Sequence, residues 1–225
     1  MTNYGDELAQ AGLAIQAIKL NPETPFVWAS GYHMPIYNDN RMFLYFPEYR
    51  NLIIEGFKKL IRTENIDFDI IAGTSTAGIP HGALLADKLN VPFIYIRDKP
   101  KAHGLKNQIE GIDAASDINS KSVLVIEDLI STGGSSARAV QAVRDANGAV
   151  DYCFSIFNYG LNKATSAFNK LNAPCKTASI LTYDVLLKTA KETGYMSEAQ
   201  IKLLKEWKDN PFEWGEKHGF PQIIR

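Results

Sequence analysis

Two adjacent acids, Glu127 and Asp128, directly follow a run of four apolar residues, Val123 to Ile126. An uninterrupted apolar run of this kind predicts a strand that is buried on both faces, as central strands of parallel sheets are. Two carboxylates at the end of a buried strand cost free energy unless they have a task. We therefore predict that Glu127 and Asp128 carry part of the chemistry of this chain.

The loop after the acids, residues 131–136, consists only of serine, threonine and glycine, and helical spacing of apolar residues follows it. Backbone N–H groups of such a loop at a helix N-terminus form an anion site, to which the hydroxyls of Ser131, Thr132 and Ser135 can add donors. The loop has no lysine and no Gly-x-Gly-x-x-Gly pattern, which excludes the common nucleoside-triphosphate and dinucleotide motifs. Carboxylates repel phosphate but accept hydrogen bonds from a diol. The pattern therefore predicts a ribose-5-phosphate site, the alternative being an ordinary strand–turn–helix.

A second strand–loop–helix unit precedes this one. Residues 68–72 read as a buried strand, and the loop 73–80 leads into a helix over 83–89. This loop is either a second anion site or an unspecialised turn. A third strand, Phe93–Ile96, leads into a segment with four cationic side chains, Arg97, Lys99, Lys101 and Lys106. The stretch 100–120 has no clear period, and long aperiodic loops in compact domains are usually functional or disordered. It is either a positively charged lid or a solvated run of charges.

The remaining pattern predicts the fold. Helices are expected over 4–19, from Pro47 onward, and over 161–171, 185–190 and 198–207, with strands at 152–157 and 177–181. Residues 21–46 predict short strands and turns. Strands that alternate with helices indicate an α/β fold with a central, mostly parallel sheet flanked by helices, and such sheets bind ligands at the carboxyl ends of their strands.

Composition excludes several classes of protein. The 225 residues carry a formal net charge of −1, with 45% hydrophobic and 22% charged residues, which is typical of a globular protein and offers no basic field for nucleic acid. No apolar stretch is long enough for a membrane span, and the polar, acidic N-terminus is unlike a signal peptide. Cys153 and Cys175 lack the spacing of a metal or redox site. We expect one cytoplasmic domain spanning residues 1–225.

The stretch 122–140 resembles the ribose-phosphate-binding signature of the type I phosphoribosyltransferases, and two further segments resemble the orotate phosphoribosyltransferases in particular. The segment 21–46 is similar to the hood of that family, and 97–111 to its lid. The hood residues that match are Phe26, Ser30, Gly31, Pro35, Tyr37, Asp39 and Arg41. The lid residues that match are Arg97, Lys99, Lys101, His103, Gly104, Gln108, Ile109, Glu110 and Gly111. The chain departs from the family at His33-Met34, where Lys-Ser is frequent. It also departs at Asn158-Tyr159-Gly160, where some branches place an arginine.

The resemblance implies transfer of ribose 5-phosphate from phosphoribosyl pyrophosphate to orotate, in pyrimidine (UMP) biosynthesis. It implies a hood at about 21–46 over the base and a mobile lid at about 98–118. It also implies a homodimer whose lid reaches the adjacent subunit, and Mg²⁺ held mainly by substrate and water, with no direct protein ligand. Glu127, Asp128, Lys101 and His103 are the implied catalytic residues, and Ser131 also touches orotate. The residues implied to bind phosphoribosyl pyrophosphate are Arg97, Lys101, His103, Glu127, Asp128, Leu129, Ile130, Ser131, Thr132, Gly133, Gly134 and Ser135.

Three other functions stay open at this point. A purine phosphoribosyltransferase would keep the same cradle and change the base. A non-catalytic regulator of the same fold would bind nucleotides without turnover. A serine hydrolase would use Ser75, Asp128 and His218, which occur in the right order, but the last glycine of its nucleophile turn is missing. The hood and the lid favour the orotate enzyme over all three.

Overall fold

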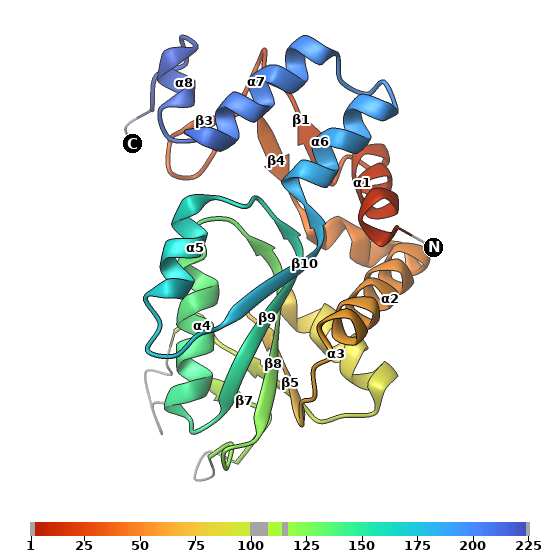
Figure 1. Cartoon of the computed structure of the whole chain (residues 1–225), viewed down its shortest axis with the longest axis vertical. Helices are drawn as coiled ribbons and strands as arrows, with labels where there is room; N and C mark the ends of the chain where they lie inside the picture. Colours follow the sequence, from red (N-terminus) through yellow and green to blue (C-terminus); the bar gives the residue numbers. More distant parts are fainter. Residues whose placement is uncertain (1–2, 100–107, 114–116, 224–225) are drawn as a thin grey trace. The chain divides into compact units, whose positions relative to one another are not determined.

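The computed structural model describes residues 3–99, 108–113 and 117–223 (Figure 1). The chain divides into two compact units. The smaller is Met1–Tyr49 with Leu181–Arg225, and the larger is Arg50–Ile180. The proposed hood belongs to the smaller unit, and the two acids with both candidate anion loops belong to the larger one. That the whole chain acts as a single phosphoribosyltransferase domain stays a prediction.

The larger unit is built on a six-stranded sheet with the order β10-β9-β8-β5-β6-β7. The strands are β5 (Ile70–Thr74), β6 (Phe93–Ile96), β7 (Ile109–Glu110), β8 (Ser122–Ile130), β9 (Ala149–Asn158) and β10 (Lys176–Thr182). β5 pairs in parallel with both β6 and β8, β8 pairs in parallel with β9, and β7 pairs antiparallel with β6. The predicted mostly parallel sheet is therefore confirmed.

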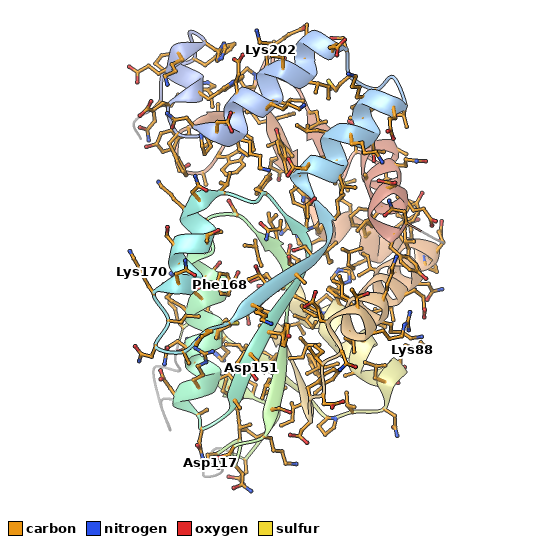
Figure 2. All side chains as sticks on the ribbon, in the orientation of Figure 1. Lys88, Asp117, Asp151, Phe168, Lys170 and Lys202 are labelled. Carbon is orange, nitrogen blue, oxygen red and sulfur yellow. The ribbon has the colours of Figure 1, made fainter. Side chains whose placement is uncertain are left out.

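Helices cover both faces of this sheet. α4 (Gly134–Asp145) and α5 (Asn162–Asn169) lie on one side, and α2 (Pro47–Glu64) and α3 (Gly78–Leu89) on the other (Figure 1). The core beneath α4 and α5 contains Val125 of β8, Val140 of α4 and Phe168 of α5. Charged residues such as Lys88 and Lys170 point outward (Figure 2). Burial of one face of each helix against the sheet is what fixes the loops at the strand ends.

Several element boundaries differ from those that the sequence predicts. β8 continues to Ile130 instead of stopping at Ile126, because Leu129 and Ile130 still pair with Phe157 and Asn158 of β9. The two acids therefore lie inside the strand and not after it. α3 begins at Gly78, five residues before the predicted start at Ala83. The stretch 100–120, expected to be aperiodic, contains β7, whose Ile109 pairs with Ile96.

The smaller unit combines short strands with helices. β2 (Phe26–Val27) pairs with β3 (His33–Met34), β1 (Ile18–Leu20) pairs with β4 (Ile36–Asn38), and a 3₁₀ helix, η1, spans Asn40–Tyr45. The short strands predicted for 21–46 are thus confirmed. The helix predicted over 4–19 is shorter: α1 is Tyr4–Ala14, because Ile18 instead pairs with Asn38 in the β1–β4 ladder.

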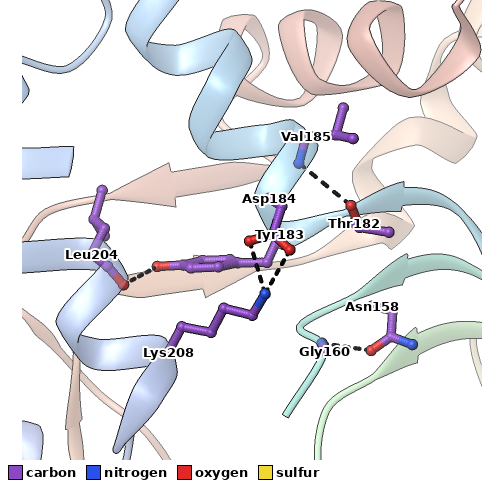
Figure 3. A network of polar contacts seen from close by, with 8 residues as sticks. All are labelled: Asn158, Gly160, Thr182, Tyr183, Asp184, Val185, Leu204 and Lys208. Atoms are coloured by element: carbon purple, nitrogen blue, oxygen red, sulfur yellow. Dashed lines mark hydrogen bonds and ion pairs between the residues drawn. The ribbon is translucent and has the colours of Figure 1, made fainter. Parts of the chain in front are cut away.

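Helices from the end of the chain complete the smaller unit: α6 (Tyr183–Glu192), α7 (Glu198–Asp209) and α8 (Trp214–Lys217). The hydroxyl of Tyr183 donates to the carbonyl of Leu204 at 3.1 Å, and Lys208 bridges to Asp184, which ties α6 to α7 (Figure 3). α7 begins with a capping box, in which Ser197 and Gln200 each bond the backbone N–H of the other. Within the described ranges, no helix combines the length and apolar character that a membrane crossing requires.

Candidate active site

Three parallel strands of the larger unit, β5, β6 and β8, end at the same edge of the sheet. A cavity of about 320 Å³ opens there. Its lining residues are Thr74, Ser75, Ile96, Arg97, Asp98, Gln108, Glu127, Asp128, Leu129, Ser131, Thr132, Gly133, Ser135, Arg138 and Ala139. The carboxyl edge of a parallel sheet is where α/β proteins bind ligands. The two acids, the 131–135 loop and the end of β5 therefore line one cavity at this edge of the sheet.

Glu127 is buried, with 6% of its surface exposed, and three protein groups hold its carboxylate. Its Oε1 accepts from the Thr74 hydroxyl at 2.6 Å and from the backbone N–H of Asp128 at 3.0 Å, and its Oε2 accepts from the Ser136 hydroxyl at 3.0 Å. A carboxylate has about four acceptor positions. Three of these positions are taken by groups of β5, β8 and α4, which together fix Glu127 at the wall of the cavity.

The pKa of Glu127 is raised from its ordinary value of 4.5 to about 7, mainly by burial and additionally by the neighbouring Asp128 carboxylate. The hydrogen bond from Thr74 acts in the opposite direction, because it stabilises the ionised form. Glu127 consequently titrates near neutrality. An ionisable group with a strongly shifted pKa in a cavity is a recognised mark of a functional site.

The loop between β8 and α4 depends on a glycine. Gly133 has a φ of +75°, and a β-carbon placed on it would lie 2.8 Å from the α-carbon of Ala164 in α5. Both the backbone conformation and the space therefore require glycine there. α4 begins at the next residue, so the N–H groups of its first turn lie beside the loop, which is the arrangement that an anion site requires. That the loop binds an anion stays a prediction.

The second loop is packed directly against the first site. A β-carbon on Gly78 would lie 2.5 Å from the Ile126 carbonyl oxygen of β8 and would also collide with the Thr74 hydroxyl. Only glycine lets the first residue of α3 approach β8 this closely. The loop from Ser75 to Ala77 is thereby held beside the strand that carries the acids.

Arg97 lies at the end of β6 and lines the cavity. Its Nη1 contacts Oε1 of Glu110 in β7 at 3.3 Å, and its Nε donates to the carbonyl of Lys99 at 3.4 Å. The arginine is thus held by β7, a strand within the range of the proposed lid. Lys101 and His103, the other two predicted lid residues, lie outside the described residues, so their roles stay predictions.

Most of the predicted phosphoribosyl pyrophosphate residues that the structure describes meet in the cavity, but two are absent from its lining. Ile130 is fully buried and belongs to the hydrophobic core that also contains Val140 of α4 and Phe168 of α5. Gly134 is the first residue of α4 and has no side chain to contribute. At the end of β9, where an arginine is absent, the Asn158 side chain accepts from the N–H of Gly160 at 2.7 Å (Figure 3).

Comparison with known proteins decides the family. A phosphoribosyl transferase domain model matches residues 46–168. An orotate phosphoribosyltransferase from Cytophaga hutchinsonii is 45% identical over 212 residues, covering 94% of this chain and 99% of the relative. One from Lactococcus lactis subsp. cremoris is 48% identical over 202 residues, covering 90% and 94%. The chain belongs to the orotate phosphoribosyltransferase family.

Solved structures agree with this assignment to the orotate phosphoribosyltransferases. UMP synthase from Leishmania donovani superposes with a TM-score of 0.72 at 26% identity, covering 90% of this chain and 42% of that longer chain. The orotate phosphoribosyltransferase of Aeropyrum pernix superposes with a TM-score of 0.69 at 23% identity, covering 84% and 99%, and shows that the fold is shared.

Two residues that complete this family member's site were not singled out from the sequence: Thr74 and Ser136. Both bind the Glu127 carboxylate. The sequence periodicity does contain a signal for each of these two residues. Thr74 continues the alternation of Ile70 and Ala72 on one face of β5, and Ser136 lies one turn before Val140 on the buried face of α4. A hydroxyl at a position that the period assigns to the core indicates a buried polar partner.

Proposed function

We propose that this chain transfers ribose 5-phosphate from phosphoribosyl pyrophosphate to orotate, giving orotidine 5′-phosphate and pyrophosphate. The observation that carries the proposal is the cavity in which two carboxylates stand beside a hydroxyl and glycine loop at a helix N-terminus. Family membership over more than 90% of the chain supplies the substrate class. The same reaction places the protein in pyrimidine (UMP) synthesis.

The acids bind the ribose of the ribose 5-phosphate, and the loop of residues 131–135 binds its phosphate. Asp128 and Glu127 accept hydrogen bonds from the ribose hydroxyls, and the N–H groups and hydroxyls of residues 131–135 hold the phosphate. Loss of pyrophosphate leaves positive charge on the ribose ring. Carboxylates held in place beforehand stabilise that charge without reorganisation. Ser131 also contacts orotate in this arrangement.

The pyrophosphate leaves on the side of the 75–77 loop and of the lid. Arg97, Lys101 and His103 neutralise its charge and exclude water, which would otherwise hydrolyse the donor. By family likeness the lid of one subunit serves the site of its partner, so the active form is a homodimer. We place the enzyme in the cytoplasm.

Mg²⁺ fits the donor groups of this cavity as a substrate-bound ion. Among the described residues, no cluster of three or more His, Cys, Asp or Glu side chains could hold a metal by itself. Mg²⁺ commonly keeps several waters and binds one or two carboxylates together with substrate phosphates. Asp128, which lines the cavity, would interact with the ion through water. When bound, the ion would neutralise charge on the pyrophosphate.

The test is an absorbance assay of orotate consumption with phosphoribosyl pyrophosphate and Mg²⁺, run in parallel with uracil, hypoxanthine and adenine. We expect turnover of orotate alone. Turnover of a purine in its place would overturn the choice of base, and nucleotide binding without any turnover would indicate a regulator.

Asp128→Asn tests the role of the acids. We expect a loss of turnover of at least about a hundredfold, because the variant keeps the shape but removes charge at the ribose. Asp151→Asn is the matched control, since Asp151 is an exposed acid near the start of β9, outside the cavity lining. Equal activity of the two variants would remove Asp128 from the mechanism.

The shared lid is tested by mixing protomers. Heterodimers of Lys101→Ala and Asp128→Asn subunits contain one site with both residues intact only if the lid acts across the interface. Recovery of part of the activity is expected, and inactive heterodimers would argue for a lid that closes over its own subunit.

A further inference from the structure

Arg138 is an exposed arginine of α4 whose side chain lines the cavity. It stands one helical turn after Gly134, so both residues lie on the same face of the helix. A β-carbon placed on Gly134 would lie 3.5 Å from Nη1 of Arg138. The guanidinium therefore folds back along α4 to its first turn, beside the loop of residues 131–135.

The charged residues that line the cavity show why the position of Arg138 matters for ligand binding. Three acids line it, namely Asp98, Glu127 and Asp128, against two cationic residues of the described chain, Arg97 and Arg138. Arg97 is held by Glu110 at 3.3 Å. Within the residues that the structure describes, Arg138 makes no ion pair with an acidic side chain. It is thus the cation of the lining that has its donors available for a ligand.

The anion loop also lacks a cation of its own. Residues 131–136 supply N–H groups and hydroxyls but no lysine or arginine. A phosphate monoester carries up to two negative charges, and helix N-terminal N–H groups supply only about half of one positive charge. A planar guanidinium can meet two phosphate oxygens at once, which is the geometry that makes arginine a preferred phosphate ligand.

We propose that Arg138 is a substrate-binding residue that contacts the terminal phosphate of the ribose 5-phosphate in the 131–135 loop. The proposal deepens the proposed function and rests on it for the identity of the donor substrate. Because the guanidinium lies at the first turn of α4 and not at the 75–77 loop, it acts on the 5′-phosphate end of the donor and not on its pyrophosphate. Arg138 sets how tightly the donor is held, and orotate binding does not depend on it.

The test compares Arg138→Gln and Arg138→Lys with wild type and with Arg62→Gln. Arg62 is the matched control, since it is an exposed arginine near the end of α2 in the same unit and outside the cavity lining. Calorimetry measures binding of ribose 5-phosphate and, separately, of pyrophosphate with Mg²⁺. Steady-state kinetics give KM for phosphoribosyl pyrophosphate and for orotate. Circular dichroism confirms that each variant is folded.

We expect Arg138→Gln to weaken ribose 5-phosphate binding about tenfold, the size of one charge-assisted hydrogen bond at a site open to water. KM for the donor should rise by a similar factor, while KM for orotate and the affinity for pyrophosphate stay at wild-type values. Arg138→Lys should recover part of the loss because it restores the charge without the planar fork. Arg62→Gln should match wild type.

Unchanged ribose 5-phosphate binding in folded Arg138→Gln would overturn the proposal, as would a loss confined to pyrophosphate. The binding measurement needs no turnover. It therefore judges Arg138 even if wild type fails to consume orotate, an outcome that would refute the proposed function by itself.

Discussion

Replacing Glu127 by glutamine should make the protein more stable at neutral pH. The amide keeps the shape of the side chain and its contacts: its oxygen accepts from Thr74 and from the N–H of Asp128, and its NH₂ group can donate to the Ser136 hydroxyl. What the change removes is the cost of ionising a carboxyl group that is 6% exposed.

The size of the effect follows from the pKa of Glu127. Raising it from 4.5 to about 7 on folding corresponds to about 3 kcal/mol, because one pKa unit is about 1.4 kcal/mol. The folded state binds this proton more tightly than the unfolded state does. The stability that protonated Glu127 contributes is therefore complete below pH 4.5 and is lost as the pH rises through about 7. Of the total, about 2 to 3 kcal/mol disappears between pH 5 and pH 8.

The assay is urea unfolding of wild type and Glu127→Gln at a series of pH values from 5 to 8, followed by far-ultraviolet circular dichroism. Tryptophan fluorescence does not serve here, because Trp28, Trp207 and Trp214, the three tryptophans of the chain, all belong to the smaller unit. All other titrating groups are common to both proteins, so the difference between the two curves isolates Glu127. The matched control is Glu64→Gln, an exposed acid at the end of α2.

The reasoning predicts a difference that grows with pH in favour of the glutamine variant and levels off above about pH 8. A difference that stays constant from pH 5 to pH 8 would show that Glu127 keeps an ordinary pKa. A difference that grows in favour of wild type would show that its three hydrogen bonds outweigh burial.

Two other changes test single features. Gly133→Ala should cost about 1 to 3 kcal/mol in urea unfolding and raise KM for the donor, because it forces a side chain into a φ of +75° and against Ala164; wild-type values for both would contradict the account of the loop. Tyr183→Phe should cost about 1 kcal/mol, because it removes the buried hydrogen bond to the Leu204 carbonyl. Fluorescence of Trp207, whose ring lies 5.1 Å from that of Tyr183, follows this loss, and an unchanged midpoint would mean that the carbonyl finds another donor.

The strands of the larger unit were predictable because their signal is local. Phe93–Ile96 is a strand with the predicted bounds, since Pro92 precedes the four residues and the charged Arg97 follows them. The end of β8 was predicted too early for the opposite reason. The prediction assumed that a charged residue ends a buried strand. This assumption fails at Glu127, because the Thr74 hydroxyl, 53 residues away in the sequence, donates a hydrogen bond to its carboxylate.

The candidate site divides in the same way. The acids and the 131–135 loop are contiguous, so their types and spacing predicted the ribose and phosphate roles. Arg138 lies beyond the loop on an exposed position of α4, where an arginine is ordinary, and only the fold places it at the cavity. Periodicity likewise could not show that the helix from Tyr4 ends at Ala14, because the reason is the pairing of Ile18 with a strand 20 residues later.

If Glu127 binds the ribose as proposed, its pKa also predicts that substrate binding exchanges protons with the surrounding buffer. A ribose hydroxyl that donates to the carboxylate stabilises its ionised form, so part of a proton leaves the protein as the ligand arrives near pH 7. The heat of binding then includes the ionisation heat of whatever buffer takes up that proton. We therefore expect Glu127 to add to the pH dependence of donor affinity near pH 7, beside the titration of the donor's own phosphate, whose second pKa is about 6.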